Sequence, residues 1–286
     1  MENISRNLSQ GLAVDPEKIK KKQEWSTKKT KFIWKLQRLI RNLIPIIIFL
    51  IFWELAPKIG LVSPVFIPPF SLAVLSIVKM VKTGAIIGHV TISLYRAFAG
   101  LFLSLIVAIP LGVAIGINKK AQDFLNPILS LFGQVSPMAL FPVFIIVLGV
   151  GEESKIGIIF WSCVWPILLN TISGVSHADY ALIKAARVMG ASPLKVLLKV
   201  IMPAALPEIF PGLKISTAMA IVMLCAAEML GAKKGLGFLI SFSQQIFQIA
   251  DMYAAIILIA ILGLLLNYAV TAWENKVLAW KKINKE

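Results

Sequence analysis

The chain has 286 residues, of which 58% are hydrophobic and only 15% are charged. This composition is too apolar for an ordinary soluble domain and indicates a protein that crosses a membrane several times. Its formal net charge of +15 at pH 7 is typical of nucleic-acid binders. Here, however, the basic residues lie in tails and loops beside apolar runs, so we expect them to orient the chain in the membrane and expect no nucleic-acid partner.

The first apolar run starts only near residue 42, after a long polar segment that is rich in lysine. A cleavable signal peptide would place its apolar region closer to the start, so we predict a cytoplasmic segment instead. The two cysteines, Cys163 and Cys225, both fall within apolar stretches. We therefore expect packing roles for them and neither a disulfide nor a metal site.

Apolar runs predict an all-α protein with about six membrane spans. In chain order, the runs cover about residues 42–57, 90–117, 127–150, 156–173, 208–230 and 253–273. The first is short for the roughly 20 residues that a span needs, unless its flanks contribute. Between the first two runs, apolar residues at 72, 74, 75, 77, 78 and 81 predict a short helix along the outer interface. Lys79 and Lys82 argue against a seventh span there.

These elements divide the chain into four parts. They are a basic cytoplasmic segment 1–41, a first span with an external segment 42–89, a core membrane region 90–275 and a cytoplasmic tail 276–286. The core includes a cytoplasmic loop at 176–206. Of the 29 lysines and arginines, 21 fall in segments on the side of the N-terminus and six on the opposite side, which predicts that both termini are cytoplasmic.

Small residues and prolines mark the spans themselves. Ala108, Gly112 and Gly116 form a line of small residues that lets helices approach closely. This line fits both packing within one chain and a contact between two copies. Prolines occur within predicted spans two to four, at positions 110, 137, 142 and 166. They permit kinks, which either shape a pathway or are simply tolerated.

No catalytic constellation stands out in the sequence. His89 and His177 are far apart and lie near predicted span ends, which argues against a metal or general-base role. The segment GVGEESK at 149–155 lacks the spacing of a phosphate-binding loop, and no strand precedes it. We therefore expect no catalytic residue, cofactor or metal in this chain, and expect any nucleotide to bind another subunit.

Glu228 is the notable ionisable residue within an apolar run, near the outer end of the fifth predicted span. In one interpretation it lines the translocation route or bonds to backbone groups there. In the other it is an interfacial carboxylate that pairs with Lys233 or Lys234. Arg96 and Lys214 also lie near span ends, where long side chains reach the interface.

Residues 184–203, KAARVMGASPLKVLLKVIMP, lie between two apolar runs but hold four cations. Each cation would cost about 2.5–3.5 kcal/mol at a bilayer centre, so this segment is not a span. Gly190 predicts a left-handed helix stop, Ser192 a cap and Pro193 a first helical position. Pro203 predicts the end of the second helix. We call residues 184–203 the elbow, and expect two short helices at the cytoplasmic face.

The elbow resembles the signature of permeases of binding-protein-dependent ABC importers, which reads EAA, three residues, Gly, nine residues and I-x-L-P. The matching or conservative positions are Ala185, Ala186, Gly190, Val200, Met202 and Pro203, whereas Lys184 replaces an acidic residue. The segments PVFIPPFSLAVL, ARVMGAS, MPAALPEIFPGLKI and AAEMLGAKKGLGFLI are similar to the aliphatic sulfonate, taurine and nitrate branch. The resemblance covers roughly residues 60–282.

This resemblance implies the type I importer permease fold in a prokaryotic cell membrane. It implies a homodimer in lipid with two cytoplasmic ATPase subunits, which bind the ATP, and an extracytoplasmic solute-binding protein. The implied function is inward transport of a small anionic solute by alternating access. The implied ATPase-coupling residues are Ala185, Ala186, Arg187, Gly190, Ser192 and Pro203. The alternative is an ion-coupled secondary transporter or channel, which would show buried acids at mid-membrane and no elbow.

Overall fold

The computed structural model describes residue 41 and residues 43–280. Most of the predicted basic segment 1–41, and residues 281–286 of the predicted tail, lie outside this range. The chain divides into two compact units, Met1–Phe70 and Ser71–Glu286.

In the first unit, a helix covers residues 43–58, where the sequence predicts a span at 42–57. This helix is not among the described helices that are long and apolar enough to cross a membrane. The indole of Trp53 donates to the backbone oxygen of Pro68 at 3.1 Å, and its ring packs on Phe70 with centroids 5.4 Å apart. These contacts hold the chain that follows the helix against its last two turns.

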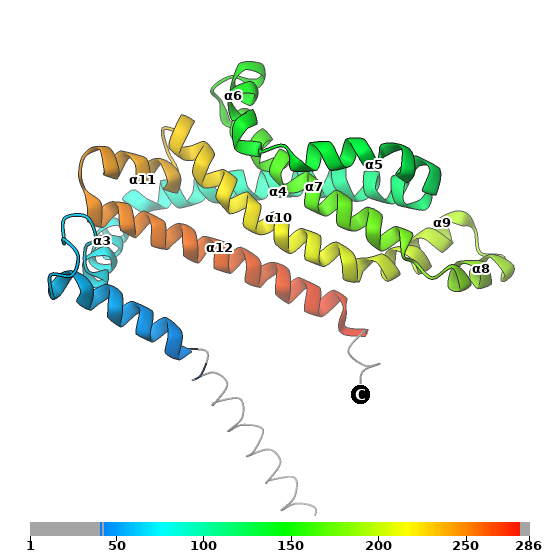
Figure 1. Ribbon diagram of the computed structural model, residues 1–286, viewed down its shortest axis with the longest axis horizontal. Coiled ribbons are helices and arrows are strands. Elements are labelled where there is room, and N and C mark those ends of the chain that lie inside the picture. Colours follow the sequence, from blue (N-terminus) through cyan, green and yellow to red (C-terminus); the bar gives the residue numbers. More distant parts are fainter. Residues whose placement is uncertain (1–40, 42, 281–286) are drawn as a thin grey trace, which may run out of the picture. The chain divides into compact units, whose positions relative to one another are not determined.

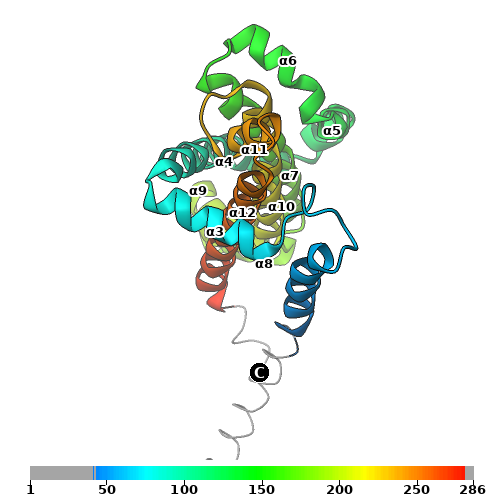
Figure 2. The same ribbon diagram turned by 90° about the vertical axis from the view of Figure 1, so that its left-hand side faces the viewer.

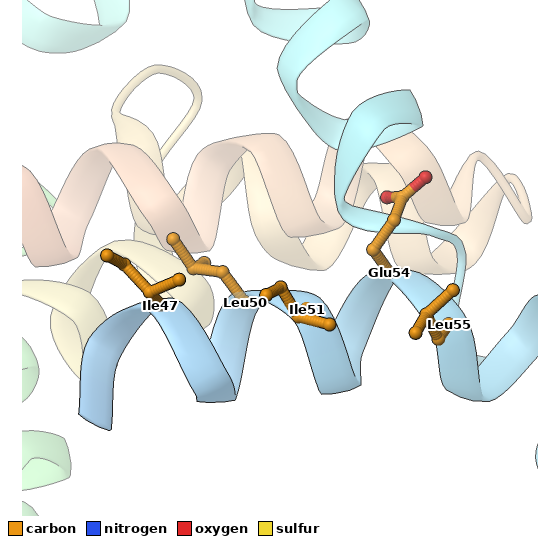
Figure 3. Close-up of a pocket in the computed structure, with 5 residues that line it drawn as sticks. All are labelled: Ile47, Leu50, Ile51, Glu54 and Leu55. Carbon is orange, nitrogen blue, oxygen red and sulfur yellow. The ribbon is translucent and has the colours of Figure 1, made fainter. Parts of the chain in front are cut away.

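A pocket of about 370 Å³ lies along this helix (Figure 3). Its lining is apolar except for one carboxylate: Ile47, Leu50, Ile51, Glu54 and Leu55. Glu54 forms an ion pair with Lys58 of the same helix. A depression lined by isoleucine and leucine side chains from a single helix suits contact with lipid chains and offers no chemistry.

The described part of the second unit is helical. Its elements are α3 (Phe70–Lys82), α4 (Ala85–Ile117), α5 (Lys119–Gln134), α6 (Pro137–Leu148), α7 (Glu152–Ser176), α8 (Tyr180–Val188), α9 (Pro193–Val196), the π-helix η1 (Leu197–Ile201), α10 (Met202–Gly231), α11 (Leu236–Gln245) and α12 (Ile249–Val277). Among the described residues, α4, α7, the continuous run Pro193–Gly231 and α12 are long and apolar enough to cross a membrane, and α5 with α6 makes a fifth if that bent pair is one span. The all-α membrane fold is confirmed.

The third predicted span, 127–150, is wrong as a single helix. The chain breaks between α5 and α6, whose axes differ by 90°. Pro137 has no backbone N–H and disfavours helical backbone at the residue before it, and Ser136 is extended at φ −60° and ψ 119°. The prolines at 110, 142 and 166 lie inside continuous helices and are tolerated there.

Four long helices form the bundle. Helix α7 packs against both α4 and α10, and α10 packs against α12, so the four run side by side (Figures 1 and 2). The start of α4 and α11 lie at one end, and α8 and α9 lie at the other (Figure 1). The apolar core is built mainly from α4, α7 and α10.

The line of small residues lies inside this bundle. A Cβ atom added to Gly112 would approach the Cβ of Thr171 to 2.6 Å, and one added to Gly116 would approach the Cβ of Val175 to 2.8 Å. Ala108 is fully buried. The structure therefore assigns this line to packing of α4 on α7 within one chain, and not to a contact between copies.

Cys163 packs as expected. It is buried on α7, its Sγ donates to the backbone oxygen of Ser216 at 3.2 Å, and the hydroxyl of Ser216 donates to the backbone oxygen of Cys163 at 2.7 Å. This reciprocal pair joins α7 to α10. Cys225 is half-buried, and both cysteines are free thiols.

Gly112→Ala should destabilise the protein, whereas Gly88→Ala in the same helix should not. The added methyl group at Gly112 meets Thr171, while at Gly88 it meets nothing within 4 Å. We expect the first change to lower the free energy of unfolding by about 1–3 kcal/mol. Thermal unfolding of both variants in detergent micelles measures the difference, and equal melting temperatures would contradict the α4–α7 packing.

Candidate functional site

Arg96 on α4 is the centre of a buried group of charges. Its guanidinium is 2% exposed and binds Glu152, the first residue of α7, through two parallel bonds: Nε to Oε2 at 2.6 Å and Nη2 to Oε1 at 2.7 Å. We expected Arg96 to reach the membrane interface, and this expectation is wrong. The side chain turns into the protein because carboxylates there compensate its charge.

Glu228 on α10 is the second carboxylate of this group and has no exposed surface. Its oxygens accept from Arg96 Nη1 at 2.7 Å, from Ser93 Oγ at 2.7 Å and from the Gly237 amide at 2.8 Å. Pairing with Lys233 or Lys234 is therefore not what the structure shows. Lys234 takes part only through its backbone oxygen, which accepts from Arg96 Nη1 at 2.8 Å. We call Ser93, Arg96, Glu152 and Glu228 the Arg96 cluster.

The loop between α10 and α11 folds over this cluster. Nδ1 of His89 lies 2.9 Å from the backbone oxygen of Gly235 and 3.1 Å from its amide nitrogen, and the Leu236 amide donates to Ser93 Oγ at 2.9 Å. Gly235 has φ 133°, a backbone conformation that favours glycine, and any side chain there would meet the Glu228 carboxylate. His89 further stacks on Phe238, with centroids 6.1 Å apart. The loop backbone is thus fixed by side chains of α4 and α10.

The Arg96 cluster joins α4, α7, α10 and the start of α11 at one end of the bundle. Both Glu228 oxygens are occupied, so a solute reaches this carboxylate only if the cluster opens. Translocation lining by Glu228 therefore stays a prediction. Among the described residues, no group of three histidine, cysteine or acidic side chains is placed to hold a metal ion.

The elbow occupies the other end of the bundle. Helix α8 ends in a Schellman motif: the Ala191 amide donates to Ala186 O at 3.1 Å and the Gly190 amide donates to Arg187 O at 3.0 Å. Gly190 has φ 79°, which confirms the predicted left-handed stop. Ser192 stands at the N-cap of α9, where it forms no side-chain cap bond, and Pro193 is confirmed as the first residue.

The prediction that Pro203 ends the second helix is wrong. Helical structure continues from Pro193 to Gly231, with Pro203 in the first turn of α10. The π-helix η1 lies just before it, and the amide of Met202 donates to Leu197 O across five residues. This wider turn accommodates a proline, which offers no amide hydrogen and needs space for its ring.

The signature residues of the elbow fall into two groups. Ala186 is buried at 8% and packs with Val175, Val196 and Ile201 of its own chain. Ala185, Arg187, Gly190 and Ser192 are exposed, and Pro203 is half-buried.

Sequence reasoning missed the most exposed apolar side chains of the elbow. Val188 and Met189 are each 80% exposed, and Leu194 is 64% exposed. We call these three residues the elbow patch. Exposed apolar side chains that have cations such as Arg187 and Lys195 as sequence neighbours are typical of a surface that binds a protein. The signal was present in the sequence, because apolar residues flank a glycine stop in an otherwise basic segment.

Known proteins resemble this chain in sequence over most of its length. The family described as "Binding-protein-dependent transport system inner membrane component" matches residues 100–278. The chain is 33% identical over 239 residues to the putative aliphatic sulfonates transport permease protein SsuC of Bacillus subtilis, which covers 84% of this chain and 86% of that protein. It is 31% identical over 260 residues to the taurine transport system permease protein TauC of Escherichia coli. This match covers 89% of this chain and 94% of that protein.

A third relative and a solved structure extend the comparison. The bicarbonate transport system permease protein CmpB of Synechococcus elongatus is 34% identical over 185 residues, covering 64% of this chain and 66% of that protein. A chain of the inward-facing MetNI methionine ABC transporter superposes with a TM-score of 0.57 at 22% identity, over 67% of this chain and 95% of that one. The structural likeness shows a shared fold.

Removing both partners of the Arg96–Glu228 ion pair should cost less than the sum of the two single losses. Arg96→Met leaves the buried carboxylate of Glu228 uncompensated and removes both bonds to Glu152, which is 43% exposed, so we expect a loss of about 3–5 kcal/mol in the free energy of unfolding. Glu228→Gln should cost less, because Glu152 still compensates Arg96, and the protein should still assemble. The double variant should lose less than the sum of the two.

A double-mutant cycle by denaturant unfolding in detergent measures this coupling. Lys234→Ala is the control, because its side chain lies outside the cluster, and it should change stability by less than about 0.5 kcal/mol. Additive losses, or a Lys234→Ala effect as large as that of Glu228→Gln, would rule out the ion pair described above.

Proposed function

Because the chain belongs to the family of binding-protein-dependent transport system inner membrane components, and to its sulfonate and taurine branch, we propose that it is the membrane subunit of an ATP-driven importer of small organosulfonates. The observation that carries this proposal is the match to SsuC and TauC, which covers more than four-fifths of each chain. Membership of this family argues against the alternative function of an ion-coupled secondary transporter or channel.

In this proposal the elbow binds the ATPase subunits in the cytoplasm. The orientation is supported by the excess of lysine and arginine on the side of both termini. The contact is supported by the elbow patch, where Val188, Met189 and Leu194 expose apolar side chains beside a rigid glycine turn. This chain performs no hydrolysis itself, and the ATP binds the partner subunits.

Helix α10 provides the physical connection for alternating access. The helical run from Pro193 to Gly231 is continuous over 39 residues, so it begins in the elbow and ends three residues after Glu228. A displacement of the elbow by the ATPase therefore acts along one helix on the Arg96 cluster. We propose that the cluster holds this end of the bundle closed at rest and opens during the transport cycle.

The solute arrives from an extracytoplasmic binding protein that docks on the end opposite the elbow, and the permease functions as a homodimer in the membrane. The relatives' substrates, aliphatic sulfonates and taurine, share a sulfonate group and a short carbon chain. Bicarbonate, the substrate of CmpB, has no carbon chain, and the greater coverage by SsuC and TauC favours the sulfonates.

Deletion of this gene should abolish growth on taurine or on a short alkanesulfonate as sole sulfur source, and should leave growth on sulfate unchanged. Sulfate is the control for sulfur assimilation that bypasses sulfonate uptake. Normal growth on every sulfonate, combined with a defect on limiting bicarbonate or nitrate, would contradict the proposed substrate.

Met189→Glu should weaken ATPase binding without changing membrane insertion. The carboxylate would enter an apolar contact while the residue lies outside the core of this chain, and Met189→Leu is the matched control. We expect a rise of about tenfold or more in the dissociation constant for the ATPase. Co-purification of the complex from membranes measures it. Normal ATPase binding and transport by Met189→Glu would show that the elbow patch is not the contact.

A further inference from the structure

Three hydrogen-bond donors converge on the carboxylate of Glu228. Arg96 Nη1 donates to it at 2.7 Å, the hydroxyl of Ser93 lies 2.7 and 2.9 Å from its two oxygens, and the amide of Gly237 donates at 2.8 Å. Gly237 is the second residue of α11, and free amides at a helix N-terminus favour a negative charge. The donors thus form a site for an oxyanion, and a carboxylate of the same chain occupies it.

The donors and the carboxylate belong to different helices. Ser93 and Arg96 lie on α4, and Gly237 lies on α11. Glu228 lies on α10. The amide of Leu236 donates to Ser93 at 2.9 Å, which ties the two donor-bearing helices to each other. A displacement of α10 therefore withdraws the carboxylate and leaves the donors together.

Lys155 of α7 adds a second buried positive charge beside the cluster. It is 3% exposed, and its ammonium donates to the neutral backbone oxygen of Gly151 at 2.7 Å. Its charge interacts with those of Arg96, Glu152 and Glu228. With Glu228 in place, two cations face two carboxylates and the charges balance. Without Glu228 one positive charge is left over, which favours a monovalent anion in its place.

The cluster also reaches the surface at an end of the bundle that attracts anions. Glu152, which binds Arg96, is 43% exposed. The loop that covers the cluster carries two exposed cations, Lys233 and Lys234. Exposed cations raise the local concentration of anions. An anionic solute is therefore drawn to the end of the bundle at which Glu228 is withdrawn.

We propose that Ser93, Arg96 and Gly237 bind the anionic group of the solute, and that Glu228 occupies their site while the cluster is closed. When α10 withdraws Glu228, the sulfonate group takes the place of the carboxylate, and when α10 returns, the carboxylate displaces the solute. The exchange replaces one negative charge by another, so the buried cations stay compensated. The inference rests on the proposed function and assigns the residues that bind the anion in it.

Thermal unfolding of the purified full-length Glu228→Ala variant in detergent, with methanesulfonate added at constant ionic strength, tests this proposal. The alanine removes the carboxylate and leaves space beside the donors. We expect methanesulfonate to raise the melting temperature saturably, by about 3 °C or more. Dimethyl sulfone, a neutral molecule of similar shape, should not raise it. The matched control is Glu228→Gln, which removes the same charge but fills the space, and should show no saturable rise.

A second measurement uses the complete transporter, trapped with ADP and vanadate so that the cluster is open. Radiolabelled methanesulfonate should bind the trapped transporter and not the nucleotide-free one. Ser93→Ala removes one donor to the anion and should raise the dissociation constant about tenfold. Ser104→Ala is the matched control, because Ser104 is buried on the same helix but donates to Leu101 O of that helix. It should bind as the wild type does.

Equal stabilisation of Glu228→Ala and Glu228→Gln, or equal stabilisation by methanesulfonate and dimethyl sulfone, would overturn the proposal. So would stabilisation by short-chain phosphatidylglycerol alone, which would assign the site to a lipid headgroup. If Glu228→Ala does not fold, unchanged binding by Ser93→Ala in the trapped transporter overturns the proposal instead.

These assays and the growth test fail independently. Sulfonate-dependent growth combined with either failure refutes the anion site and leaves the proposed function standing. Absence of any sulfonate growth defect refutes the proposed function, whereas the unfolding assay measures the site without transport.

Discussion

The rest of the bundle depends on the compensation of one buried positive charge. Arg96 lies on α4 with 2% of its side chain exposed, and the effective cost of moving an ion into such an environment is several kcal/mol. That cost is met only if Glu152 and Glu228 approach from α7 and α10, each within 2.7 Å of a guanidinium nitrogen. The positions of three long helices at one end of the bundle are therefore fixed together.

The same constraint shapes the loop that covers the cluster. Glu228 has more acceptor capacity than Arg96 uses, so amides of the chain around Gly235 and Gly237 fold toward Glu228 and Ser93. Glycine is required at Gly235 because of its φ of 133° and its contact with the carboxylate. At the opposite end, a glycine with φ 79° at Gly190 shapes the elbow. One continuous helical run connects these two rigid ends.

The sequence predicted the helices and turns that depend on residues close to one another along the chain. Apolar runs indicated the long helices, α3 followed from the spacing of its apolar residues, and Gly190 followed from the need for a left-handed helix stop. The proline rule was less reliable, because Pro137 coincides with a break while Pro110, Pro142 and Pro166 do not. Whether a proline breaks a span depends on how neighbouring helices pack, and that is not a local property.

The candidate site was only partly predictable. Glu228 was visible as an acid in an apolar run, but its partner Arg96 lies 132 residues away along the chain. In the sequence, Glu152 stands out only as part of the segment 149–155, which lacks the spacing of a phosphate-binding loop. The sign that was available is Arg96 itself, a cation within a predicted apolar span, since such a residue needs a buried acid. The exposure of Met189 became evident only from the structure.

In the proposed transport cycle, the Arg96 cluster is closed at rest and opens when the elbow is driven by ATP. The reactivity of Ser93→Cys, in a protein without Cys163 and Cys225, tests it directly, because Ser93 is fully buried beside Glu228. In the complete transporter, the thiol should resist a small thiol reagent at rest and react many times faster during ATP hydrolysis. Equal protection with and without ATP, while solute uptake continues, would contradict this account.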